Sequence, residues 1–200
     1  MNILKVEHHS AEELISRLRR VTLMKNPGVR IYENASISLE RIATPQLSPA
    51  QRYVLSSELL KVRELKWSLA DAGYDIFNLE GYLSILIEGQ DEAIDLLPVV
   101  VEESIERDGS IHNIINDGMH RAYMAYLDWV IPQVVFVRNV PKQYPYYAFP
   151  VPEGWAGLQL VDSLPENLLK KWHRIRDYKS LYRDFNSAFQ NVGGPRGRTK

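Results

Sequence analysis

The sequence contains no cysteine among its 200 residues. This absence excludes a disulfide framework, a thiol nucleophile, an iron–sulfur cluster and any zinc site with cysteine ligands. A chain of this length buries about two-thirds or more of the surface that its unfolded state exposes, so its core needs neither a disulfide nor a metal. We therefore expect one domain of ordinary size, stabilised by the burial of apolar residues.

Long apolar runs are also missing. No run approaches the ~18 residues that cross a bilayer, and the first fourteen residues, MNILKVEHHSAEEL, lack the apolar core of a signal peptide. These two absences predict a cytoplasmic protein with no membrane partner.

The net charge is −1, but the charges are unevenly distributed. Residues 170–200 carry nine Lys or Arg against two Asp, whereas residues 70–118 carry twelve acids and one base. The basic C-terminal arm predicts an anionic partner, such as nucleic acid or phosphate. The alternative is that the arm folds against acidic residues of its own chain, which is common in globular proteins.

The hydrophobic pattern predicts both helices and strands, and therefore an α/β (or α+β) fold. Ser10 with Glu13, and Ser48 with Gln51, form two capping boxes that mark helix starts. Strand 133–138 carries few charges, so we expect it to be central. Asp108-Gly109 is a turn signal, which is compatible with a hairpin of strands 96–104 and 110–116. The predicted strands are 29–33, 37–42, 96–104, 110–116 and 133–138; the predicted helices are 6–24, 48–72 and 119–130, with further helices between 165 and 186 and a helix or irregular stretch at 77–87.

Prolines and aromatic residues cluster between residues 139 and 155. This composition predicts an extended segment, in which Tyr144, Tyr146, Tyr147 and Trp155 either pack in the core or stack on a base. The glycine-rich end, residues 193–200, is expected to be disordered.

The most informative stretch joins strand 110–116 to a helix through Asp117-Gly118. Glycine permits a sharp turn and the close approach of an anion, and a helix N-terminus offers free N–H groups and a partial positive charge. A histidine and an arginine in the first turn complete a phosphate-binding arrangement. The predicted ligand-binding residues are Asn116, Gly118, Met119, His120 and Arg121; the predicted catalytic residues are Asp117, His120 and Arg121, with Asp117 also able to hold Mg²⁺ or to accept a hydroxyl proton.

Each of these residues also has a simpler interpretation. Asp117 can be a turn or cap residue, and Asn116 can form an Asx turn. His120 can be a core histidine, and Arg121 can form a salt bridge with the acidic 70–118 region. Met119 lines either the core or a pocket.

The stretch IINDGMHRAYMAYLDWVIPQVVFV, residues 114–137, resembles the strand–DGxHR–helix–strand core of the ParB/sulfiredoxin-like superfamily. ISLERI at 37–42 resembles the first strand of that superfamily, and LLPVVV at 96–101 resembles the strand before the turn. The resemblance implies a core at 36–140 that consists of a small mixed sheet with flanking helices. The rest of the chain has no counterpart in the superfamily; we expect an N-terminal helical extension at 1–35, an aromatic and basic extension at 141–192 packed on the core, and a disordered tail at 193–200.

Differences between this chain and members of the superfamily limit which of their functions it can share. Sulfiredoxins have a catalytic cysteine where this chain has Met119, so that chemistry is excluded, and ParB proteins have a glutamate there. The turn is most similar to that of free-serine kinases, which implies ATP or another nucleotide, Mg²⁺ and a small-molecule substrate. Those kinases use a glutamate shortly after the first strand as base, but residues 42–52, IATPQLSPAQR, contain no carboxylate.

Three functions follow from these observations. The leading hypothesis is a nucleotide-dependent phosphotransferase acting on a small molecule or a nucleotide-like acceptor. The first alternative is a ParB-like nucleic-acid-binding module that uses the same turn and the basic 170–200 arm. The second alternative is a non-catalytic protein that binds a partner, which the missing carboxylate favours.

Overall fold

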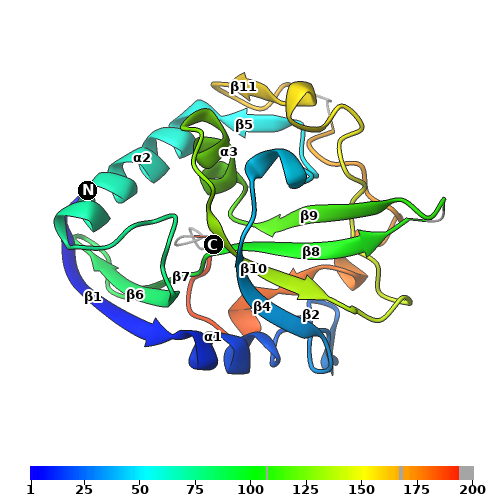
Figure 1. The fold of residues 1–200 in the computed structure, drawn as a ribbon, viewed down its shortest axis with the longest axis horizontal. Helices are drawn as coiled ribbons and strands as arrows, with labels where there is room; N and C mark the ends of the chain where they lie inside the picture. Colours follow the sequence, from blue (N-terminus) through cyan, green and yellow to red (C-terminus); the bar gives the residue numbers. More distant parts are fainter. Residues whose placement is uncertain (107, 167–168, 194–200) are drawn as a thin grey trace.

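The computed structural model describes residues 1–106, 108–166 and 169–193 as a mixed α/β fold (Figure 1). The sequence-based prediction of fold class is thereby confirmed. The elements are β1 (Ile3–Ser10), α1 (Ala11–Leu18), β2 (Thr22–Leu23), β3 (Asn26–Arg30), β4 (Ser36–Arg41), η1 (Thr44–Gln46), β5 (Tyr53–Leu55), α2 (Ser56–Asp71), β6 (Gly81–Ile87), β7 (Ile94–Leu96), β8 (Val99–Ile105), β9 (Ile111–Asp117), α3 (Met119–Leu127), β10 (Gln133–Arg138), η2 (Gly154–Gly157), β11 (Gln159–Val161), η3 (Tyr178–Ser180), β12 (Arg183–Asp184) and η4 (Phe185–Ser187).

A four-stranded sheet of order β4-β10-β8-β9 positions the candidate site. Strand β10 runs antiparallel to β4 and parallel to β8, and its residues 134–137 are buried, so the prediction of a central strand is confirmed. Strands β8 and β9 form the predicted hairpin, which turns at Gly109 with φ of 85°. The hairpin carries the chain to the end of β9, where α3 begins.

A second sheet of order β1-β6-β7 lies beside the first, at the lower left of Figure 1. The prediction of a helix from residue 6 was wrong, because residues 3–10 instead pair antiparallel with β6. The predicted capping box does mark the helix start: the N–H of Glu13 donates to Ser10 Oγ at 3.2 Å. Leu14 and Leu18 are then fully buried on the inner face of α1.

Long-range pairing also changed three other predicted elements. Helix α2 begins at Ser56 and not at residue 48, because Ser48 bridges Ile114 and β5 pairs with β11. The stretch 77–87 ends in strand β6. Within the described part of 165–186 there is no α-helix; this segment holds η3, β12 and the start of η4. Of the predicted disordered tail, only Gly193 lies within the described residues.

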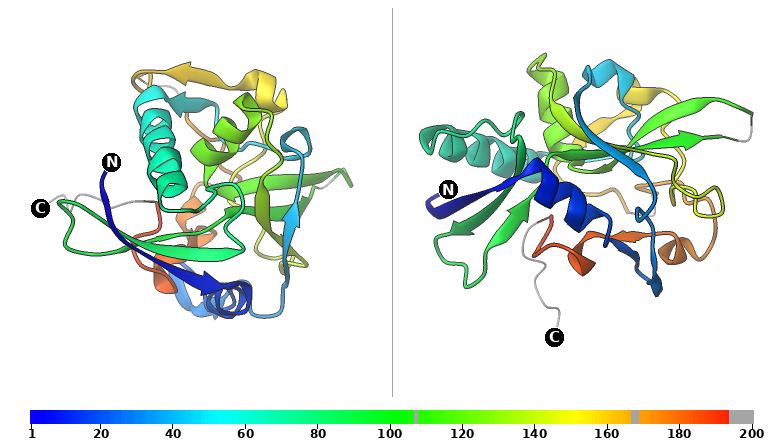
Figure 2. Two further views of the ribbon diagram at one scale, coloured as in Figure 1. Left: turned by 60° about the vertical axis from the view of Figure 1, so that its left-hand side comes forward. Right: turned by 60° about the horizontal axis from the view of Figure 1, so that its bottom comes forward.

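Helices α2 and α3 pack against each other beside the sheets (Figure 2). The C-terminal segment, residues 169–193, starts beside β5, where the N–H of Arg52 donates to the carbonyl of Lys170, and continues to β12, which pairs with β2. One apolar cluster joins α2, β6 and α3, and another joins α1, the four-stranded sheet and η4. The end of β9 lies where these parts meet. Among the described residues, no helix combines the length and the apolar character that crossing a membrane requires.

The pairing of β1 with β6 gives a prediction about stability. A Cβ atom at Gly81 would lie 1.9 Å from the His9 carbonyl oxygen, so the strands must separate to admit it. We expect Gly81→Ala to lower the free energy of unfolding by about 1–3 kcal/mol, measured by urea denaturation. Gly28→Ala is the matched control, since its Cβ would meet only Asn26 Oδ1 at 3.5 Å. Equal stability of the two variants would contradict this packing.

Candidate functional site

The turn between β9 and α3 has the geometry that its sequence predicts. Gly118 has φ of 82° and ψ of 27°, a left-handed conformation, and a Cβ atom there would lie 2.8 Å from Arg121 Nη2. No side chain caps α3, and the N–H of Ala122 donates to the carbonyl of Gly118 at 2.9 Å. The N–H groups of residues 119–121 precede that bond and have no acceptor within the helix. They are therefore available to an anion.

Arg121 lies beneath this turn and is only 7% exposed. Its guanidinium donates to the carbonyl of Leu97 and, at 3.0 Å, to Asp117 Oδ2. Burial lowers the pKa of Arg121, and the Asp117 carboxylate opposes that shift. The alternative interpretation of Arg121, a salt bridge with the acidic 70–118 region, is therefore confirmed by its contact with Asp117. A direct contact between Arg121 and an anion stays a prediction and depends on its remaining N–H donors.

A cavity of about 740 Å³ opens beside the turn. This volume lies in the range of ~300–1,000 Å³ that is usual for small-molecule sites. All of residues 116–121 line it, so every residue that the sequence predicted for the site is brought together there. The other polar or charged residues of its wall include Gln51, Glu58, Lys61, Asp95, Tyr147, Lys171 and Tyr182.

His120 is one of the residues that line this cavity, but its imidazole is partly withdrawn from it. Its Nε2 atom is buried and has no hydrogen-bond partner among the described residues. Burial lowers the pKa of His120, Lys170 lowers it further, and the carboxylate of Glu58 raises it. The neutral form is therefore favoured near pH 7, and it can donate or accept one hydrogen bond.

Lys171 contributes a cation from the C-terminal segment. Its Nζ donates to the Tyr147 hydroxyl, and burial, together with Lys170, lowers the pKa of Lys171 to about 8 while Asp117 opposes the shift. At pH 7 the ammonium is still mostly protonated. A partly desolvated ammonium interacts strongly with an anion because water screens it little.

Three charged residues of the cavity wall were not predicted from the sequence: Glu58, Lys61 and Lys171. Glu58 lies in the first turn of α2, six residues beyond the stretch 42–52 that contains no carboxylate. Lys61 Nζ donates to the Glu58 carboxylate at 2.7 Å. The signal for Glu58 is its place in the first turn of a helix that begins at residue 56. Lys171 was counted only as one charge of the basic arm, and no local pattern distinguishes it from Lys170.

Asp117 does not form a complete metal site by itself. One carboxylate oxygen already accepts from Arg121, and the part of the chain that the structure describes contains no group of three His, Asp or Glu side chains that could hold a metal ion. In proteins, Mg²⁺ is usually coordinated by one or two carboxylates together with phosphate oxygens of the substrate. The predicted Mg²⁺ therefore fits only as an ion that is shared with a bound nucleotide.

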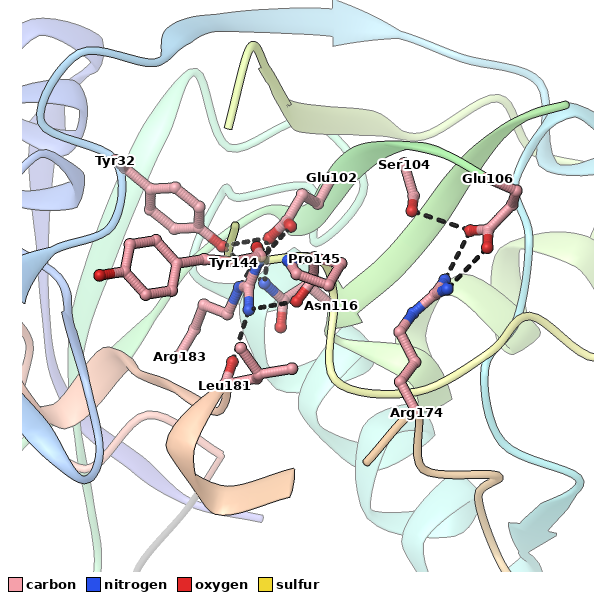
Figure 3. Close-up of polar contacts among 10 residues, drawn as sticks. All are labelled: Tyr32, Glu102, Ser104, Glu106, Asn116, Tyr144, Pro145, Arg174, Leu181 and Arg183. Atoms are coloured by element: carbon pink, nitrogen blue, oxygen red, sulfur yellow. Dashed lines mark hydrogen bonds and ion pairs between the residues drawn. The ribbon is translucent and has the colours of Figure 1, made fainter. Parts of the chain in front are cut away.

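A buried polar network fixes the segment next to the turn (Figure 3). Arg183 donates to both oxygens of Glu102, at 2.5 and 3.0 Å, and the two side chains are at most 2% exposed. The hydroxyl of Tyr32 donates to Glu102 at 2.9 Å, and Asn116 Nδ2 donates to the Tyr32 hydroxyl at 2.6 Å. The amide of Asn116 is thus held by the network, which fixes the strand end before Asp117.

The network also shows how Arg183 stays charged inside the protein. Burial by itself would lower the pKa of Arg183, but Glu102 and its neighbours raise it above the ordinary value. Burial and the Glu102 charge raise the pKa of Tyr32 well above its ordinary range, so its hydroxyl stays a donor.

A second pair attaches the C-terminal segment to Glu106, the residue that follows β8. Arg174 donates to Glu106 at 2.5 and 2.6 Å (Figure 3). For Arg174 and Arg183, folding against the chain's own acids is therefore confirmed. The aromatic residues between 139 and 155 also pack against the protein. Tyr146 and Tyr147 are buried, and Trp155 stacks on Tyr126 with 4.7 Å between the ring centroids.

The Glu102–Arg183 pair gives a prediction about stability. Glu102→Gln leaves the Arg183 guanidinium buried without its counter-charge, so we expect the free energy of unfolding to fall by about 3–5 kcal/mol. Urea denaturation measures this loss. Glu103→Gln, on the next residue of the same strand, is the control and should change stability by less than about 0.5 kcal/mol. A Glu102→Gln protein as stable as this control would show that the pair does not hold the segment.

Comparison with known proteins identifies a family for this chain. The family model described as the ParB CE domain matches residues 13–159. Neither the curated proteins nor the solved structures gave a match. The matched region runs from α1 to β11, whereas Lys171 and Tyr182 of the cavity wall lie beyond it. The division at 35, 140 and 192 stays a prediction. Because the match covers well over half of its length, the chain belongs to the ParB CE domain family.

Proposed function

We propose that this ParB CE domain binds a nucleotide through its phosphates and transfers a phosphoryl group to a small hydroxyl-bearing acceptor. One observation carries the proposal: the uncapped N-terminus of α3 opens on a cavity of about 740 Å³ that Lys171 also lines. Neutral backbone donors and a desolvated cation on one cavity wall favour a polyanionic ligand.

The phosphates are bound in this proposal by three kinds of group. The free N–H groups of residues 119–121 donate to phosphate oxygens, and the ammonium of Lys171 faces them from the C-terminal segment. Arg121 adds a fixed positive charge beneath the turn, where Asp117 and the carbonyl of Leu97 hold it.

The transfer step is a displacement at the terminal phosphorus. The acceptor oxygen forms a new P–O bond, the bond to the bridging oxygen breaks, and the nucleoside diphosphate leaves. The acceptor proton passes to the Glu58 carboxylate, which lies on the same cavity wall and acts on the pKa of His120. Because phosphoryl transfer depends mainly on positioning and charge stabilisation, one base and a few donors suffice.

Mg²⁺ has a limited place in this proposal. When it is bound with the nucleotide, the ion neutralises phosphate charge, and Asp117 is the cavity carboxylate next to the turn that could contact it. The contact of Asp117 with Arg121 leaves its other oxygen for this purpose.

Nucleotide binding is tested by thermal and chemical unfolding in the presence of ATP, CTP or GTP with Mg²⁺. A hundredfold excess over Kd should stabilise the wild type by about 2.7 kcal/mol. Lys171→Met should weaken binding about 10- to 100-fold, because it removes a charged hydrogen bond. Lys179→Met, an exposed lysine of the same segment that does not line the cavity, is the control. Stabilisation by duplex DNA and by no nucleotide would contradict the proposal and favour the nucleic-acid alternative.

The same site sets the pH dependence of binding. Because the pKa of Lys171 is lowered to about 8, its ammonium is charged below that pH and neutral above it. ATP affinity should therefore fall as the pH rises from 7 to 9. In Lys171→Arg the charge persists across this range, so the fall should disappear. Calorimetric titrations at several pH values measure it, and an unchanged profile in the variant would remove Lys171 from the phosphate site.

Glu58 gives a separate test of the transfer step. Glu58→Gln should reduce the rate of ADP formation about 100-fold or more, the usual contribution of a general base, while Kd for ATP stays within about twofold. Free serine is the first acceptor to try, because the turn resembles that of free-serine kinases. Glu64→Gln, exposed on the same helix and outside the cavity wall, is the control. Equal turnover of the two variants would exclude Glu58 as the base.

A further inference from the structure

A second cavity, of about 350 Å³, lies behind Lys171 in the C-terminal segment. It is an open pocket, and four of its lining residues are aromatic: Tyr147, His173, Tyr178 and Tyr182. His173 and Tyr178 stack with ring centroids 3.7 Å apart, and Tyr147 lies 5.2 Å from Tyr182 and 6.0 Å from Tyr178. The remaining wall residues are Leu169, Lys170 and Lys171.

This second cavity, called the aromatic cavity below, adjoins the cavity at the turn. Tyr147, Lys171 and Tyr182 line both of them. The ammonium of Lys171 lies 4.8 Å from the centre of the Tyr147 ring and donates to the hydroxyl of that residue. One lysine therefore stands at the junction of a phosphate-binding surface and an aromatic surface.

We propose that the aromatic cavity is the base subsite for the nucleotide whose phosphates lie at the turn. The proposal rests on the function proposed above and extends it to the other half of the ligand. A nucleobase offers flat faces for aromatic rings to stack on, and its polar edge can meet the tyrosine hydroxyls and lysine ammoniums at the rim.

The charges of the wall exclude the other common occupant of an aromatic cavity. Aromatic cages bind quaternary ammonium groups through cation–π contacts, but Lys170 and Lys171 would repel such a cation. His173 adds no attraction, because burial and Lys171 lower its pKa and keep the ring neutral near pH 7. A neutral heterocycle carrying an anionic tail satisfies both surfaces.

Residues outside the family match supply most of this subsite. Tyr147 lies within the matched residues 13–159, whereas Leu169, both lysines, His173, Tyr178 and Tyr182 lie beyond them. The choice of base is accordingly a property of this chain's own C-terminal segment.

Titration of the full-length protein with ATP, CTP, tripolyphosphate, adenosine and cytidine separates the two halves of the site. At least one nucleotide should bind more tightly than tripolyphosphate. Tyr178→Leu should weaken nucleotide binding about 5- to 100-fold, the usual effect of losing one stacking ring, and should leave tripolyphosphate binding unchanged. Tyr178→Phe keeps the ring and should bind nucleotide like the wild type. Tyr74→Leu, where the lost ring stacks on His8 outside both cavities, is the control for stability.

The outcomes separate the two proposals. If tripolyphosphate and every nucleotide bind equally, or if Tyr178→Leu weakens both alike, the base subsite is wrong and the phosphate site stands. If a nucleoside binds and Tyr178→Leu abolishes it, while tripolyphosphate does not bind, the subsite is supported and the phosphate site is wrong. If none of the five compounds binds, both proposals are overturned.

Discussion

The ion pair between Glu102 and Arg183 is the constraint on which the site depends. It joins the middle of β8 to β12, residues far apart in the sequence, and both side chains are at most 2% exposed. Tyr32 and Asn116 extend the network to the strand end before the turn. The two halves of the cavity wall, residues 116–121 and the C-terminal segment, are thus held by one polar centre. A shift of Arg183 would move Lys171 and Tyr182 relative to the α3 N-terminus.

A buried ion pair is an expensive way to join two segments, since apolar residues of equal volume often stabilise as well or better. Its use here is understandable from the geometry that it imposes. The guanidinium of Arg183 also donates to the carbonyls of Leu181, Pro145 and Tyr144, at 2.5, 3.0 and 2.8 Å. These directed bonds fix two stretches of backbone, 144–145 and Leu181, around one side chain (Figure 3), whereas an apolar contact would leave their relative position less defined.

The features that could be predicted from the sequence are local ones. The Ser10 cap, the Gly118 turn and the hairpin at Gly109 each depend on a few neighbouring residues, and all three are confirmed. Residues 6–10 were predicted as helix but belong to strand β1. They pair with β6, more than seventy positions away, and no local pattern records that pairing. The candidate site divides in the same way. Residues 116–121 were found from their spacing, whereas Glu58 and Lys171 reach the cavity only through tertiary packing.

The same difference between local and long-range features separates the roles of the two cations next to the turn, Arg121 and Lys171. Arg121 is adjacent in sequence and is therefore the obvious anion ligand, yet its guanidinium turns inward to Asp117 and Leu97 and supports the backbone. Its charge does not titrate in the physiological range. Lys171 comes from outside the family match, lines the cavity and has a pKa of about 8. The shared core thus supplies a fixed turn with a constant charge below it, and the C-terminal segment supplies the charge that a ligand meets and that pH can change.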